Sequence, residues 1–145
     1  MVMDDIADLL SSGGIATTIY RGFMPEQPAE AIQVLVTGGM APIRRMSGTA
    51  GASAVSASAA SGHTVVEQPT VQIVRRSASL ERAMVEMNVI WRMLDGNGDR
   101  SINGTRYQWI GAMQQPFPAG RDQSNRSLVS CNFLIAKAVS TATST

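Results

Sequence analysis

The segment most suggestive of chemistry is Asp95-Gly96-Asn97-Gly98-Asp99, which has the spacing of the start of an EF-hand calcium loop. Oxygen-bearing side chains fall at loop positions 1, 3, 5, 7 and 9, namely Asp95, Asn97, Asp99, Ser101 and Asn103. Two deciding positions differ, because position 6 is Arg100 instead of Gly and position 12 is Arg106 instead of a bidentate Glu. We therefore expect no physiological calcium site. The segment is better explained as a polar helix exit in which Gly96 or Gly98 supplies a left-handed cap.

The other residues able to take part in catalysis or metal binding are few. The single histidine, His63, borders a Ser/Ala/Gly-rich stretch, where nothing would orient a general base. The single cysteine, Cys131, excludes an internal disulfide and a Cys-cluster zinc site, and its alternating apolar neighbours predict a small buried hydrophobe. Gly38-Gly39 lacks the Lys-Ser/Thr of a phosphate-binding loop. We expect no catalytic residue, no metal, no cofactor and no enzymatic activity.

Two pairs of adjacent arginines, Arg44-Arg45 and Arg75-Arg76, concentrate the positive charge. They are open to two interpretations: solvated strand ends, or a lining near DNA or a charged subunit interface. The whole chain carries 12 Lys and Arg against 11 Asp and Glu, a net charge of +1. This balance argues against a nucleic-acid binder held by a dominant basic field.

A chain of 145 residues usually folds as one domain, and we expect one domain here. No apolar run approaches the roughly 18 residues that a membrane span needs. The first ten residues hold three aspartates and no basic residue, which is not the pattern of a signal peptide.

The clearest local pattern is an apolar stripe at helical spacing from Leu80 to Leu94, with Ser77 or Ser79 as its cap. We expect Met87 and Trp91 on this stripe to be buried against a sheet, and Val85 and Val89 to widen it. A shorter helix is predicted over Asp4–Leu10. The predicted strands are Thr17–Phe23, Ala31–Thr37 ending at Gly38-Gly39, Glu67–Arg76, Arg100–Ile102, Thr105–Met113 and Ser127–Val139.

The turns complete this prediction. Asn103-Gly104 favours a type I′ hairpin turn, and Pro116–Asp122 is predicted to be a loop. The expected fold class is α+β: a mostly antiparallel sheet with one long helix across a face and a short N-terminal helix.

One segment has a different composition. From Ser47 to Gly62, 14 of 16 residues are Ser, Ala or Gly, too few apolar groups to offset backbone ordering. The segment is predicted to be either a flexible loop or an arm that becomes ordered against a neighbouring subunit.

Six phrases occur in a characteristic order around the long helical pattern. They are FMPEQP at Phe23–Pro28, VTGG at Val36–Gly39, QPTVQIVRR at Gln68–Arg76, INGTRY at Ile102–Tyr107, PFPAGRD at Pro116–Asp122 and SCNF at Ser130–Phe133. Together they resemble the minor capsid or tail terminator family of tailed bacteriophages over nearly the whole chain. The resemblance implies a single tail-terminator-like domain, 1–145, with the Ser/Ala/Gly-rich arm inserted at about 43–62.

The resemblance implies a structural virion protein made in the cytoplasm of the host bacterium. Such a subunit would form a homo-oligomeric ring, commonly a hexamer, at the head-proximal end of the tail, and would end polymerisation of the tail tube. Its partners would be other copies of itself, the tail tube protein and the head connector or neck protein. DNA would pass through the lumen without sequence-specific binding, and no membrane would be involved. The alternative function is a head-completion or neck adaptor protein.

A ring needs two unlike patches on each subunit that meet by rotation. The arginine forks and carboxylate of Arg121, Asp122 and Arg126 suit such charged contacts. With Arg44 and Arg45, they are the candidate residues for a subunit or partner interface.

Overall fold

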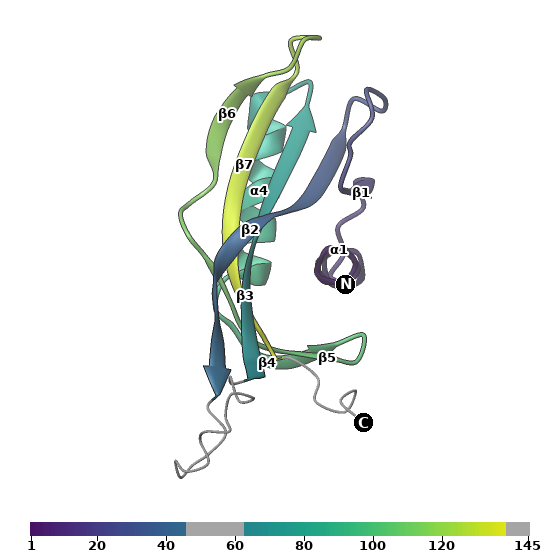
Figure 1. The fold of residues 1–145 in the computed structure, drawn as a ribbon. Helices are drawn as coiled ribbons and strands as arrows, with labels where there is room; N and C mark the ends of the chain where they lie inside the picture. Colours follow the sequence, from purple (N-terminus) through teal and green to yellow (C-terminus); the bar gives the residue numbers. More distant parts are fainter. Residues whose placement is uncertain (46–62, 139–145) are drawn as a thin grey trace, which may run out of the picture.

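Seven strands form one curled sheet in the computed structural model, which describes residues 1–45 and 63–138 (Figure 1). The elements in chain order are α1 (Val2–Ser12), β1 (Ile19–Arg21), β2 (Ala31–Arg45), β3 (His63–Ser77), α4 (Leu80–Leu94), β4 (Asn97–Ile102), β5 (Thr105–Ala112), β6 (Phe117–Arg121) and β7 (Ser127–Ala138). The strand order is β1-β2-β3-β7-β5-β4, and β6 also pairs with β7. The β1–β2 pair is parallel, whereas every other pair is antiparallel.

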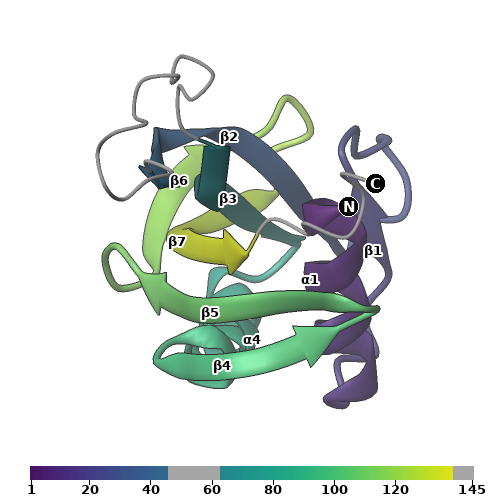
Figure 2. The same cartoon turned by 60° about the horizontal axis from the view of Figure 1, so that its bottom comes forward.

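The expected fold class, an α+β fold with one long helix across a sheet, is wrong, because strands predominate over helices. Among the described residues, the strands contain more than twice as many residues as the two helices. The helices are of comparable length, 11 residues in α1 and 15 in α4, so no single long helix dominates the sheet. The reason lies in β2 and β3, which have 15 residues each and accumulate enough twist to curl the sheet into a half-barrel (Figures 1 and 2).

Helix α4 occupies the residues that its periodicity predicts. The Ser79 hydroxyl accepts a hydrogen bond from the Arg82 N–H at 3.3 Å, which confirms Ser79 as the N-cap. Met87 is fully buried, as expected, whereas Trp91 is only partly buried at the border of the core. The chain leaves the helix through Gly96, whose φ of +76° is the left-handed conformation expected there.

The core lies between the helices and one face of the sheet. It combines apolar side chains of α1 and α4 with inward-facing residues of β2, β3, β5 and β7. Cys131 is fully buried within this core, which confirms the prediction that it is a small buried hydrophobe. Burial is the main cause that raises the pKa of this thiol to about 11, so the thiolate is disfavoured at neutral pH.

Two strand predictions are wrong. Strand β2 does not end at Gly38-Gly39 but continues to Arg45, because pairing with β3 resumes at Gly38 after a bulge at Thr37 and continues through further register shifts. At Gly39 a Cβ would lie 2.4 Å from the Gln68 carbonyl oxygen, so only glycine fits. The predicted loop at Pro116–Asp122 contains strand β6, which tolerates Pro118 because it pairs on one side only and is itself bulged.

The β4–β5 hairpin is fastened to α1 (Figure 2). Asn103 and Gly104 have φ values of +52° and +83°, which confirms the predicted turn. The Asn103 amide donates to Asp5 at 2.9 Å and to Asp8 at 2.8 Å, and the buried Tyr107 hydroxyl also donates to Asp5. Burial and this carboxylate raise the pKa of Tyr107, which keeps the phenol protonated.

Candidate subunit interface

The curled sheet has one covered and one open face. Val34, Ile73 and Cys131 pair in register and point into the core beneath α4. Their neighbours along each strand therefore point the other way. This open face carries three rows in register, Gln33–Val74–Ser130, Leu35–Gln72–Asn132 and Thr70–Leu134.

The three rows of the open face are uncharged and only partly exposed to solvent. Among the described residues, none of the side chains in the three rows is ionisable, and all except the buried Ser130 are partly accessible. Three larger apolar side chains extend the surface at its borders. Met40 pairs with Gln68, Trp109 pairs with Ala136 and Phe117 pairs with Ser130. These three are exposed, as is typical of a contact surface.

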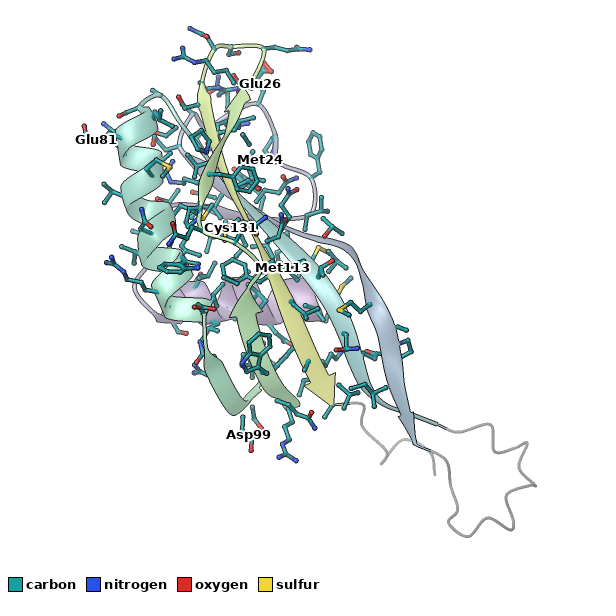
Figure 3. All side chains as sticks on the ribbon, turned by 90° about the vertical axis from the view of Figure 1, so that its left-hand side faces the viewer. Met24, Glu26, Glu81, Asp99, Met113 and Cys131 are labelled. Carbon is teal, nitrogen blue, oxygen red and sulfur yellow. The ribbon has the colours of Figure 1, made fainter. Side chains whose placement is uncertain are left out.

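One end of the open face lies under the Phe23 loop, residues 22–29. The Gln33 amide, from the open face, donates to the Gly22 carbonyl at 2.6 Å. On the same face, the Arg76 guanidinium donates to the Pro28 carbonyl at 2.5 Å. These two anchors fix the loop, yet Phe23 is 83% exposed. In Figure 3, Met24 and Glu26 of this loop lie beside β6 and β7, away from α4.

Three of the five sequence-predicted interface residues come together at this end of the molecule. Asp122 accepts from the N–H groups of Ser124 and Arg126 at 3.0 and 2.8 Å, and its carboxylate pairs with the Arg126 side chain at 2.8 Å. The backbone bond from Arg126 is the main cause that lowers the pKa of Asp122. Arg126 is buried and also donates to the Glu26 carbonyl, whereas Arg121 is exposed at the end of β6.

Asp122 and Arg126 therefore hold the β6–β7 turn against the Phe23 loop, and Arg121 is left as the accessible charge. Arg44 and Arg45 lie elsewhere, at the far end of β2, where their backbones pair with Thr64 and His63. Figure 1 shows the two regions at opposite ends of the molecule. The structure does not bring the five candidates into one surface, and their role in an interface stays a prediction.

The second arginine pair is structural. Arg75 and Arg76 are 3% and 4% exposed, so the interpretation as solvated strand ends is wrong for them. Arg75 contacts Glu86 and, at 2.9 Å, Glu30. Burial opposes ionisation of Glu30, but hydrogen bonds from Ala78 and the β3 side chains lower its pKa to about 2. No periodic pattern could have revealed this network, because it joins β3 and α4 to Glu30, which lies 45 residues before Arg75 in the chain.

A cleft on the outer side of α4 is a further feature that the sequence did not reveal. This α4 cleft has a volume of about 440 Å³ and is lined by Gly14, Ile15, Thr17, Arg75, Arg82, Val85, Glu86 and Val89. Val85 and Val89, expected to widen the buried stripe, are instead 61% and 45% exposed. Thr17 donates to Glu86 at 2.8 Å, which ties the segment before β1 to the helix.

The side chains of the EF-hand-like segment are engaged in the β4–β5 hairpin. Asp95 accepts from the Ala112 N–H at 2.7 Å, and Asp99 pairs with Arg106 at 2.7 Å. The hydrogen bond from Arg106 is the main cause that lowers the pKa of Asp99. Within residues 1–45 and 63–138, no three His, Cys, Asp or Glu residues are grouped as metal ligands.

The comparisons give these surfaces their context. Neither helix among the described residues is long and apolar enough to cross a membrane. No curated protein matches the chain. A family model described as bacteriophage tail terminator protein matches residues 8–139, which include the end of α1, all of α4 and all seven described strands. The match agrees with the resemblance carried by the six sequence phrases, and the chain belongs to the bacteriophage tail terminator family.

Proposed function

We propose that the protein forms a closed ring, a hexamer, at the head-proximal end of the phage tail tube. There it ends tube polymerisation and joins the tail to the head connector. The observation that carries the proposal is the family match over residues 8–139. It is supported by two unlike surfaces on one subunit, the open sheet face and the α4 cleft, since a ring requires contacts of this kind.

The strand edges favour a ring held by side chains over one held by a continuous sheet. Pro118 and the bulge beside it interrupt β6. Pro42 and two register shifts interrupt the outer part of β2, and Asp99 and Arg100 place charges on β4. Such features reduce edge-to-edge pairing of strands. The exposed apolar side chains are thus the better candidates for the subunit contacts.

In this proposal the ring covers the addition surface of the last tube layer and presents a connector-binding surface in its place. Arg121, Asp122 and Arg126 lie at one end of the subunit, and Arg44 and Arg45 at the other. We assign these two ends to contacts with neighbours, tube or connector. DNA passes through the lumen without base-specific contacts, in keeping with a net charge of only +1.

The test is a phage that lacks this protein, with tail length and head joining scored by electron microscopy. A terminator predicts tails of abnormal, variable length. Uniform tails of normal length already joined to filled heads would refute the proposal. Uniform tails that fail to join heads would replace it with a head-completion or neck adaptor function.

A further inference from the structure

We propose that neighbouring copies join head to tail by insertion of Phe23 of one copy into the α4 cleft of the next. The inference rests on the proposed function in one respect, the assembly of identical copies into a ring. It adds the two surfaces that meet and the direction of the contact.

Phe23 has the features of an interface anchor. It is the most exposed large apolar residue among those described, at 83%, so solvent covers most of its ring. Its loop is nevertheless fixed, because Gln33 and Arg76 hold the backbone on either side of it. A rigidly presented aromatic side chain loses little conformational entropy on binding, and few residues of this kind carry most of the energy of an interface.

The α4 cleft suits an aromatic side chain. Its volume of about 440 Å³ lies within the range of natural binding pockets. Ile15, Val85 and Val89 form apolar walls, and the floor is the ion pair between Arg75 and Glu86. The two valines are one helical turn apart and 61% and 45% exposed, so a docked ring would cover apolar surface of both.

The two surfaces lie on opposite sides of the sheet. Gln33 and Arg76 reach the Phe23 loop from the open face, whereas Arg75 reaches Glu86 of α4 from the covered face. Adjacent residues of a strand point to opposite faces, which separates the two arginines in this way. A contact between unlike surfaces on opposite sides repeats from copy to copy, and it closes when the rotation is suitable.

The charges are complementary. Glu26 is exposed three residues after Phe23 and is the only ionisable residue of the Phe23 loop. At the cleft, the side chain of Arg82 is 62% exposed, and within the described part of the chain it forms one ion pair, with Glu30 at 3.3 Å. Insertion of Phe23 would bring Glu26 toward this guanidinium, which fixes the orientation of the loop in the cleft.

The experiment is cross-linking of full-length protein assembled on purified tail tubes, with a short bismaleimide. The double variant Gln27→Cys/Val85→Cys, which keeps Phe23 and places the first thiol at an exposed position of the same loop, should give a ladder of covalent oligomers. A mixture of the two single variants should give dimers only, and each single variant alone should give none. Cys131 is buried and does not compete for the reagent. The matched control is Gln27→Cys/Asp99→Cys, which places the second thiol on exposed β4.

The outcomes separate this inference from the proposed function. If rings are seen on tube ends but the double variant cross-links no more than the control, the contact is refuted and the ring stands. Dimers from Gln27→Cys alone would also refute it, because they require a symmetric contact. If no ring binds tube ends at all, the proposed function fails first.

A second measurement guards against cross-linking by chance collision. Phe23→Ala should weaken assembly at least tenfold and leave the unfolding midpoint of the subunit unchanged, because the side chain is exposed. Phe23→Leu should retain part of the affinity. Equal assembly of the Ala variant and the wild type would overturn the inference.

Discussion

Removal of Glu86 should reveal how much the folded state depends on the buried arginine of β3. Arg75 is 3% exposed, and its Nε–H is donated to the Glu86 carboxylate. In Glu86→Ala, Glu30 remains as a partner of Arg75 at 2.9 Å, but one donor of the buried guanidinium loses its acceptor. Loss of a buried partner costs about 3–5 kcal/mol. Because Glu30 compensates in part, we expect about 2–4 kcal/mol, including the lost bond from Thr17.

The assay is urea denaturation followed by tryptophan fluorescence, at concentrations where the subunit is monomeric so that assembly does not contribute. Asp99→Ala is the matched control, since it removes an ion pair whose side chains are 59% and 64% exposed, and it should barely move the midpoint. A second variant, Arg75→Met, removes the buried cation itself and should cost less than Glu86→Ala. The reasoning is refuted if Glu86→Ala and Asp99→Ala have the same midpoint.

Three further predictions concern stability. Tyr107→Phe removes a donor from Asp5, which is 2% exposed, and should cost about 1–3 kcal/mol in the same denaturation assay; an unchanged midpoint would contradict it. Gly39→Ala should destabilise more than Gly38→Ala in thermal unfolding, because both have positive φ but only Gly39 faces a backbone carbonyl too closely for a Cβ. Equal losses would show that steric contact is not the cause. Glu30 has its pKa lowered from 4.5 to about 2, so it stabilises the fold above pH 4.5 and loses this contribution as the pH falls toward 2. The shift corresponds to about 3 kcal/mol, reduced by solvent screening to about 1–2 kcal/mol since a third of the side chain is exposed. Glu30→Gln should flatten the pH dependence of the unfolding free energy in this window, and an unchanged slope would argue against it.

The sequence predicted best where the signal is local. The stripe of α4 with its Ser79 cap and the Asn103-Gly104 turn depend on residues a few positions apart, and each has the expected geometry. The family was also accessible from sequence, because the six phrases from Phe23 to Phe133 together resemble it and the family match covers all of them.

Predictions from local sequence patterns are wrong where contacts with distant parts of the chain determine the structure. Gly38-Gly39 and Pro118 are typical breakers, but a neighbouring strand supplies hydrogen bonds that carry β2 and β6 through them. Val85 and Val89 lie on the side of α4 roughly opposite its buried residues, and no element among the described residues covers them. Residues 46–62, which contain the Ser/Ala/Gly-rich segment, lie outside the described residues. The ordering of this arm against a neighbour therefore stays a prediction.

The candidate interface was only partly visible in the sequence. Arg121, Asp122 and Arg126 were selected as charged residues in a loop, and the structure uses two of them to hold a turn. Phe23 is not recognisable as an interface residue from the sequence, because a lone aromatic residue in a strand-like segment is indistinguishable from a core residue. Its exposure follows from the shortness of β1, which ends at Arg21.

The central position of β7 has a consequence for the synthesis of the protein. β7 is the last described strand in the chain, yet it separates β3 from β5 and β6 in the sheet. While a ribosome is still making the chain, the β2–β3 and β4–β5 hairpins emerge without the strand that joins them. Isolated hairpins are marginally stable in water. The core can therefore close only after Ser127–Ala138 has left the ribosome, so a transcript broken before β7 yields no competent subunit.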